Sequence, residues 1–289
     1  MSIAWVFPGQ GSQKLGMAED LLSLPGAKER FDFASQLIGR DLLEICRKSD
    51  DSNPSNDLND TRNTQPALFV VESLLVDDLL RQRRKAELVA GHSLGEFVAL
   101  YAAKVFDAKS SLRLLKRRSE LMASAGGGAM TALIGFERQH LEDLVSANEG
   151  VVIANDNSSS QIVLSGTPQA VKALSDSLQC KRAIPLQVSG AFHSPYMESA
   201  RIELEDAVNE AKIETPSAPI YQNYDAIGYT DTHKIRSNLI SQLTSPVRWT
   251  QSVNNMIENN VKKFIECGPG RVLQGLVKKI NRETDVSSL

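Results

Sequence analysis

Apolar and polar residues alternate along the chain in blocks that predict strands and helices in turn. Residues 3–7 form a short apolar run that stops at Pro8 and Gly9, which is typical of a buried strand ending in a turn. Two further runs predict strands at residues 88–90 and 263–266. The predicted helices are one opened by Pro66, a buried one at residues 97–103, and a final one at residues 272–281. This alternation favours an α/β fold.

The middle of the chain, residues 130–188, has an organisation of its own. The predicted order is strand, helix, two strands, helix, strand, over residues 130–135, 138–148, 151–155, 161–165, 168–179 and 183–188. A βαββαβ order is that of a ferredoxin-like unit. Three successive glycines at residues 126–128 provide a hinge into it. We expect a larger α/β body of residues 1–127 and 191–289, with a ferredoxin-like subdomain at residues 128–190 inserted between its halves.

Charge and hydropathy exclude several classes of function. The 289 residues carry 32 Lys and Arg against 35 Asp and Glu, so the net charge of -3 gives no general attraction to nucleic acid or to an anionic membrane. No apolar run approaches the roughly 20 residues that span a bilayer, and the first residues lack the basic start of an export signal. Residues 49–60 are too polar to pack and predict a surface loop.

The cysteines indicate a reducing compartment. Cys46, Cys180 and Cys267 are an odd number, lie far apart and lack the spacing of a metal site. We therefore expect reduced thiols, a cytoplasmic protein and no bound metal.

Residues 91–95, Gly-His-Ser-Leu-Gly, match the G-x-S-x-G pattern between a predicted strand and a predicted helix. In that context the glycines allow a tight turn that raises the Ser93 hydroxyl, while the Leu94 amide lies at the helix N-terminus, where an oxyanion would be stabilised. The alternative is an ordinary glycine-rich turn capped by Ser93. The flanking strand and helix favour the nucleophile.

A serine nucleophile needs a base close by, and the chain has four histidines. His140 and His233 lie in charged or polar stretches and are expected to be solvated. His92 adjoins Ser93 and should point to the opposite side, into packing. His193 lies in a turn of small residues where the chain returns from the inserted unit, so it is the candidate base; a purely structural histidine is the alternative.

A helix over residues 112–122 carries three adjacent cations, of which Arg118 faces the apolar stripe. Its neighbours at helical spacing are Leu114, Leu115, Leu121 and Met122. Lys116 and Arg117 have mixed neighbours and fit a solvated face. A core-facing arginine needs an anionic partner. Either an internal Asp or Glu supplies it, or Arg118 is a bidentate clamp for the carboxylate of a substrate.

These residues resemble the malonyl-CoA:acyl-carrier-protein transacylase family over nearly the whole chain. Six ordered segments carry the resemblance: residues 7–13, 64–68, 91–96, 118–122, 191–194 and 266–270. The resemblance implies an α/β-hydrolase-like core with a mainly parallel sheet and a ferredoxin-like small subdomain, in agreement with the pattern above.

The same resemblance implies roles for individual residues. Ser93 would be the nucleophile, His193 the general base and Arg118 the malonate clamp, and a backbone carbonyl at Gln242 would orient the histidine. The oxyanion hole would be formed by the amides of Gln10 and Leu94, and the acyl channel would be lined by Phe192, which crowds a methyl branch, and by an asparagine pair, Asn155 and Asn157. The sequence departs from the family at Ser159, where proline is usual, and at Ser119, where glycine is usual.

The implied reaction is a ping-pong transfer of a malonyl group from malonyl-CoA to the phosphopantetheine thiol of an acyl carrier protein, without a cofactor. Residues 65–74 and 90–103 resemble discrete acyltransferases of polyketide synthases more than the fatty-acid enzyme. A basic rim for an acidic carrier would draw on Lys14, Lys181, Arg271 or Lys278. The rival interpretations are an acyl-carrier thioesterase of the same fold and a non-catalytic docking subunit.

Overall fold

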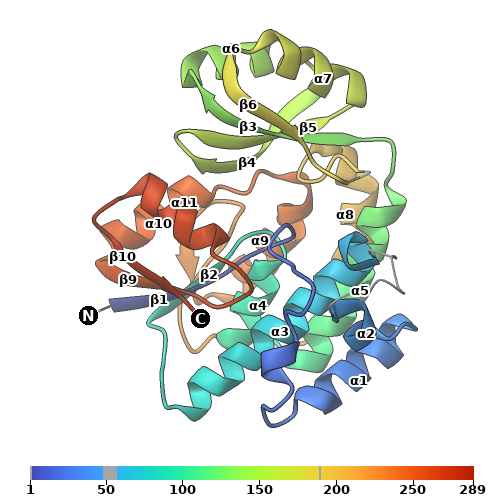
Figure 1. Ribbon diagram of the computed structural model, residues 1–289, viewed down its shortest axis with the longest axis vertical. Coiled ribbons are helices and arrows are strands. Elements are labelled where there is room, and N and C mark those ends of the chain that lie inside the picture. Colours follow the sequence, from blue (N-terminus) through green and yellow to red (C-terminus); the bar gives the residue numbers. More distant parts are fainter. Residues whose placement is uncertain (1, 48–56, 189) are drawn as a thin grey trace.

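The computed structural model describes residues 2–47, 57–188 and 190–289 of the chain. Two sheets organise it, a six-stranded sheet that is mostly parallel and a four-stranded antiparallel sheet. In Figure 1 the smaller sheet, with α6 and α7, stands apart from the other elements at the top of the view. The surface loop expected at residues 49–60 lies mainly outside the described residues, since only residues 57–60 of it are described.

The larger sheet has the strand order β10-β9-β1-β2-β7-β8. Its strands are β1 (Ser2–Phe7), β2 (Leu88–Gly91), β7 (Ile220–Tyr221), β8 (Gly228–Tyr229), β9 (Val261–Glu266) and β10 (Asp285–Ser288). All neighbours pair in parallel except β7 and β8. The expected α/β class, the mainly parallel sheet and the strands predicted at residues 3–7, 88–90 and 263–266 are confirmed.

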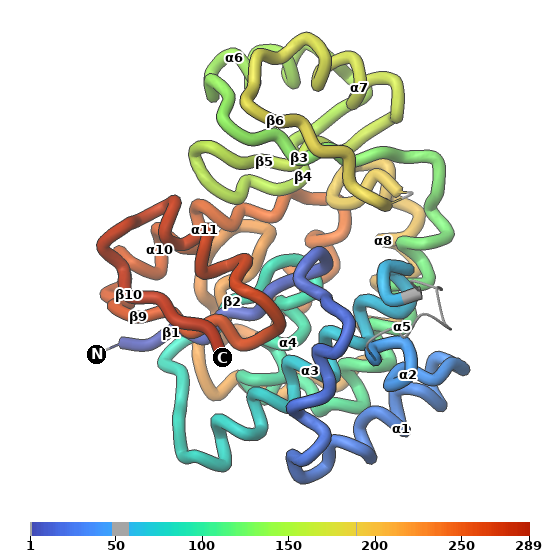
Figure 2. The backbone as a smooth tube through the Cα atoms, viewed as in Figure 1, coloured from blue at the N-terminus to red at the C-terminus, as the bar shows by residue number. Residues whose placement is uncertain are grey.

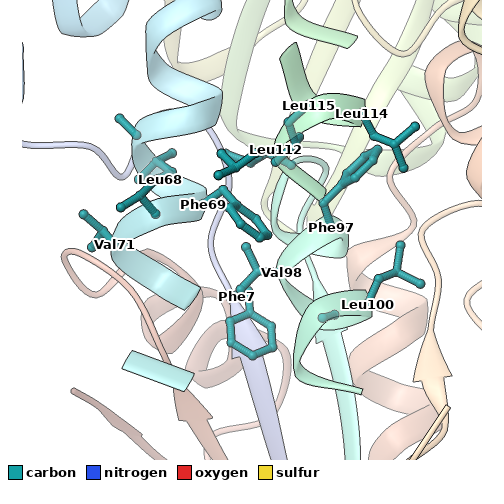
Figure 3. Close-up of a cluster of buried hydrophobic side chains, with 14 of the residues drawn as sticks. Phe7, Leu68, Phe69, Val71, Phe97, Val98, Leu100, Leu112, Leu114 and Leu115 are labelled. Carbon is teal, nitrogen blue, oxygen red and sulfur yellow. The ribbon is translucent and has the colours of Figure 1, made fainter. Parts of the chain in front are cut away.

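Helices cover both faces of this sheet because alternate side chains of β1 point in opposite directions. Trp5 and Phe7 join a core with α3 (Thr61–Arg81), α4 (Gly95–Ala102) and α5 (Ala108–Ser124). Ala4 and Val6 join a second core with α10 (Trp249–Glu258) and α11 (Val272–Ile280). Figure 3 shows the first core, in which Phe7 approaches Phe69 of α3 and side chains of α4.

The remaining helices complete the larger body. In the part of the chain that is described they are α1 (Ala27–Ile38), α2 (Leu42–Cys46), α8 (Glu198–Glu210) and α9 (Thr232–Ser241), with the 3-10 turns η1 (Glu19–Leu21), η2 (Asp57–Asn59), η3 (Pro195–Met197) and η4 (Gln242–Thr244). Within the described ranges, every helix is too short or too polar to cross a membrane.

The helix expected to open at Pro66 in fact begins five residues earlier, so that prediction was wrong. Helix α3 starts at Thr61, where the side chain of Asp60 accepts a hydrogen bond from the backbone amide of Arg62. Pro66 therefore lies inside the helix. The aspartate cap begins the helix, and the proline that follows removes only one backbone donor.

The smaller sheet has the order β4-β5-β3-β6 and is antiparallel throughout. Its elements are β3 (Ala129–Phe136), α6 (Arg138–Ser146), β4 (Val151–Ser158), β5 (Gln161–Gly166), α7 (Pro168–Ser177) and β6 (Cys180–Pro185). The last strand begins three residues before the predicted start, because Cys180 already pairs with Phe136. The tube in Figure 2 shows the chain leaving the body after α5 and returning before α8.

Three loops of the larger sheet meet at one edge because their strands run in parallel. Phe7 at the end of β1 is in register with Gly91 at the end of β2, and Ala90 of β2 is in register with Tyr221 at the end of β7. The residues that follow these strands therefore lie side by side at the carboxyl edge, where ligands of open α/β sheets bind.

Candidate active site

Ser93 lies on a sharp turn between β2 and α4, with a left-handed backbone at φ 53°. The two flanking glycines are required by close backbone approach. A side chain on Gly91 would meet the carbonyl carbon of Gly95 at 1.9 Å, and one on Gly95 would meet the carbonyl oxygen of Phe7 at 2.1 Å. The turn thus packs directly against the end of β1 and presents Ser93 above the sheet edge.

The Oγ atom of Ser93 lies 2.7 Å from Nε2 of His193. On the far side of the ring, Nδ1 lies 3.0 Å from the backbone carbonyl oxygen of Gln242. A carbonyl oxygen only accepts hydrogen bonds, so Nδ1 carries the proton and Nε2 offers its lone pair to the serine hydroxyl. The tautomer needed for a general base follows from this geometry.

Two features keep the imidazole of His193 neutral. Burial, and after it the charge of Arg118, together lower the pKa of His193 to about 3. The ring is 3% exposed. A neutral, buried imidazole that faces a serine hydroxyl is able to accept its proton at the moment of reaction.

Arg118 points into the same space from α5 and is 1% exposed. Its Nη1 donates to Oε1 of Gln65 at 2.8 Å, while its Nη2 donates to Oε1 of Gln242 at 3.0 Å and to Oγ of Ser93 at 3.1 Å. The ring centroid of Phe97 lies 5.5 Å from the guanidinium carbon. Among the described residues, every hydrogen-bond partner of the cation is neutral.

No carboxylate among the described residues forms an ion pair with this guanidinium, so the internal partner considered from the sequence is not found there. Burial lowers the pKa of Arg118 to about 10, and the more distant charge of Glu96 raises it. Nε of Arg118 has no hydrogen-bond partner in the part of the chain that the structure describes. A buried cation held only by amide and hydroxyl oxygens retains its capacity for a carboxylate ligand.

By contrast, the neighbouring cations are on the surface, as expected. Lys116 pairs with Glu120 on the same helix, and Nη2 of Arg117 pairs with Glu203 of α8 at 2.5 Å. His140 and His233 are also exposed, in agreement with the sequence.

A cavity of about 80 Å³ joins these groups. It is lined by Gln10, Gln65, His92, Ser93, Leu94, Arg118, Met122, Met130, Asn155, Leu186, Val188, Phe192 and His193. Both residues expected to supply an oxyanion hole, Gln10 and Leu94, are in its wall. So is Phe192, which is 6% exposed.

The two asparagines expected in the acyl channel differ in their surroundings. Asn155 lines the cavity, whereas Oδ1 of Asn157 lies 2.8 Å from Nε2 of His92. The Nδ2 atom of Asn155 is 3.4 Å from the same ring nitrogen. His92 was predicted to pack away from Ser93, but it lines the same cavity. It is half-buried, contacts both asparagines, and its ring is tilted by 59° to that of Trp249 at a centroid distance of 5.8 Å. Ser159, the departure from the family pattern, is exposed in the turn after β4.

Two residues that contact the candidate catalytic groups were not identified from the sequence. Gln65 holds Arg118, and Oδ1 of Asn223 accepts the backbone N–H of Ser93 at 2.7 Å. Gln65 lay in one of the six matching segments, so its signal was available. Asn223 follows a strand of two residues that shows no periodicity.

Some residues singled out in the sequence lie away from the cavity. Lys14, Lys181, Arg271 and Lys278 are all exposed, and Nζ of Lys278 donates to the carbonyl oxygens of Arg282 and Thr284. Cys46, Cys180 and Cys267 are free thiols. Within the described ranges, no three His, Cys, Asp or Glu side chains are grouped as a metal site.

Comparison with known proteins agrees with this geometry. The sequence profile of the family described as acyl transferase domain matches residues 4–289. A malonyl CoA-acyl carrier protein transacylase of Synechocystis is 42% identical over 279 residues, which cover 96% of this chain and 94% of that protein. The chain belongs to the malonyl CoA-acyl carrier protein transacylase family.

Other members of the transacylase family are similar over the same length. A polyketide biosynthesis malonyl CoA-acyl carrier protein transacylase of Bacillus subtilis is 37% identical and 98% of each chain is covered. The crystal structure of the Synechocystis transacylase superposes with a TM-score of 0.95 at 41% identity, covering 100% of this chain and 97% of that one. A malonyl-transacylase in complex with a type II polyketide synthase acyl-carrier protein gives a TM-score of 0.92 at 35% identity, covering 100% and 96%.

Proposed function

We propose that this chain transfers a malonyl group from malonyl-CoA to the phosphopantetheine thiol of an acyl carrier protein, supplying polyketide or fatty acid synthesis. The observation that carries the proposal is the meeting of Ser93, His193 and Arg118 around one small cavity. The transacylases of Synechocystis and Bacillus subtilis, and the carrier-bound transacylase, support the substrates and the partner.

In the first half-reaction His193 takes the proton of the Ser93 hydroxyl at Nε2, and Oγ attacks the thioester carbonyl. The Oγ–C bond forms, the C–S bond breaks, and the proton returns from Nε2 to the departing coenzyme A thiolate. The carbonyl oxygen of Gln242 stabilises the imidazolium by accepting the Nδ1–H. The amides of Gln10 and Leu94 stabilise the negative oxygen of the tetrahedral intermediate.

In the second half-reaction the carrier thiol gives its proton to Nε2 of His193 and attacks the malonyl ester. The new C–S bond replaces the Oγ–C bond, and Ser93 recovers its proton. One thioester replaces another, so the proposed reaction calls for no metal ion and no redox cofactor.

Arg118 sets the choice of acyl group by pairing with the free malonyl carboxylate. An acetyl group leaves the guanidinium with its neutral partners, so it lacks the charge-assisted hydrogen bonds that hold malonate. Phe192 and Asn155 line the acyl cavity, and Phe192 disfavours a methyl branch. Asn157 acts on the cavity through His92.

The proposal extends to architecture and location. The strand order of the larger sheet supports an α/β-hydrolase-like core formed by residues 1–127 and 191–289. The order β4-β5-β3-β6 supports a ferredoxin-like subdomain at residues 128–190. The three free thiols support a cytoplasmic location.

The test is one incubation with malonyl-CoA and a holo acyl carrier protein, in which malonyl-carrier and free malonate are measured together. We expect malonyl-carrier to dominate, and a Ser93→Ala variant to form neither product above background. Malonate as the main product in the presence of the carrier would identify a thioesterase instead. Absence of both products in the wild type would leave only the docking-subunit interpretation.

A further inference from the structure

Asn223 lies beside the nucleophile turn because its strand, β7, is the parallel neighbour of β2. Tyr221 at the end of β7 is in register with Ala90 of β2, so the second residue after β7 comes next to the residues that follow β2. The side chain of Asn223 is 1% exposed. It belongs to neither the acyl cavity nor the His193 contacts.

The carboxamide of Asn223 binds both sides of the turn that carries Ser93. Its Oδ1 accepts the backbone N–H of Ser93 at 2.7 Å, and its Nδ2 donates to the backbone carbonyl oxygen of Gly91 at 2.6 Å. A carboxamide offers both an acceptor oxygen and a donor N–H group, so it can bind the N–H of Ser93 and the carbonyl oxygen of Gly91 at the same time.

The backbone of Asn223 is held equally firmly. Its N–H donates to Oε2 of Glu96 at 2.7 Å, and its carbonyl oxygen accepts the N–H of Arg248 at 3.2 Å. The other oxygen of Glu96 accepts from Nε2 of Gln222 at 3.1 Å. Glu96 is itself fully buried at the start of α4, three residues after the nucleophile. Hydrogen bonds of Asn223 and Glu96 thus link the end of β7 to the start of α4 and to the turn that carries Ser93.

The geometry points to Asn223 as a positioning residue that holds Ser93 in its left-handed conformation, with Oγ in reach of His193. This inference rests on the proposed role of Ser93 as nucleophile. A non-glycine residue at positive φ is strained and persists only where the surroundings enforce it. The bonds to the N–H of Ser93 and to the carbonyl of Gly91 enforce it on either side of His92.

The hydrogen bonds of Asn223 also give the backbone N–H groups of Ser93 and Leu94 different roles. Asn223 engages the N–H of Ser93, and the next residue, Leu94, lines the acyl cavity, so only the N–H of Leu94 is left for the proposed oxyanion hole. Loss of Oδ1 would free the Ser93 N–H and allow the turn to relax toward an unstrained φ. The distance of 2.7 Å between Oγ and Nε2 of His193 would then no longer be fixed.

The test compares Asn223→Ala with Asn255→Ala. Nδ2 of Asn255 donates to the carbonyl oxygen of Ala226, so the control removes an anchor of the same loop without touching the turn of Ser93. For Asn223→Ala we expect the kcat of malonyl transfer to fall by ~tenfold to ~hundredfold, with the KM for malonyl-CoA within about twofold, because Arg118 keeps its contacts. Asn255→Ala should keep kcat within about twofold. A folded Asn223→Ala enzyme with wild-type kcat would overturn the inference.

If Asn223→Ala does not fold, hydrogen exchange of the Ser93 amide in the wild type tests the inference instead. The chain has two His-Ser pairs, His92–Ser93 and His193–Ser194, so labelling histidine carbonyls with carbon-13 and serine amides with nitrogen-15 gives two selected signals. Ser93→Ala assigns the signal of Ser93 by removing it. We expect the amide of Ser93 to exchange with deuterium ~hundredfold or more slowly than an open amide. Exchange at the open rate would overturn the inference. Wild-type enzyme that is never malonylated at Ser93 would instead defeat the proposed function.

Discussion

The Nη2 atom of Arg118 lies 3.1 Å from Oγ of Ser93, so the proposed carboxylate ligand and the proposed nucleophile are immediate neighbours. An acyl group bound to both must place its carboxylate only a few bonds from its thioester carbonyl. A three-carbon diacid satisfies this condition.

Replacing Arg118 should remove the preference for malonyl over acetyl and leave Ser93 in place. For Arg118→Ala we expect kcat/KM with malonyl-CoA to fall by ~tenfold to ~hundredfold, while transfer of an acetyl group changes little. Steady-state assays with the two thioesters measure this. The matched control is Arg117→Ala, whose side chain pairs with Glu203 on the surface and should leave both rates unchanged. Undiminished preference for malonyl-CoA in Arg118→Ala would remove the clamp from the mechanism.

The orientation of the guanidinium should depend on Gln65, which accepts from Nη1 of Arg118. Among the described residues, Gln65 forms no hydrogen bond to Ser93 or His193. In Gln65→Leu a buried N–H of Arg118 loses its acceptor. We expect the KM for malonyl-CoA to rise by ~threefold to ~tenfold, with the rate of acetyl transfer unaltered. An equal loss with both substrates would mean that Gln65 supports the whole site and not the clamp alone.

The buried imidazole of His193 should make stability depend on pH. Burial lowers its folded pKa from 6.5 to about 3, so the unfolded chain binds the proton more readily than the folded protein does. The contribution to stability is complete above the unfolded pKa and is lost as pH falls toward the folded pKa. Between about pH 7 and about pH 4 this loss amounts to about 3 kcal/mol.

A His193→Asn variant measures that contribution, since asparagine does not titrate and can still donate toward the carbonyl of Gln242. Urea unfolding of both proteins at several pH values gives the difference in unfolding free energy. As the pH falls from about 7 to about 4, the unfolding free energy of the variant should rise relative to that of the wild type by about 3 kcal/mol. Parallel pH profiles would show that His193 is not buried in a neutral form.

The sequence predicted the parts of the site that carry local signals. Ser93 stood in a strand-turn-helix pattern, and Arg118 interrupted an apolar helical stripe. His193 emerged because the other histidines had better explanations. Each of these depends on spacing within about ten residues, which is the range over which periodicity and turn chemistry act.

Other features depend on contacts between segments distant in the chain, and these escaped prediction. Asn223 acts on Ser93 across 130 positions. Strand β7 has two residues, so no alternation marks it. Asn155 and Asn157 were grouped from the sequence, but their common contact with His92 was not foreseen. Strand β6 was placed too late because most of its side chains are exposed, and a half-solvated edge strand lacks an apolar run.

The most direct test of the account is mass spectrometry of peptides from the protein after a brief exposure to malonyl-CoA without a carrier. We expect one malonyl adduct, on Ser93, that forms in the wild type and in Asn255→Ala and is absent from Ser93→Ala. Subsequent addition of a holo acyl carrier protein should discharge it. An unmodified Ser93 in active protein, or an adduct that persists in Ser93→Ala, would contradict the account.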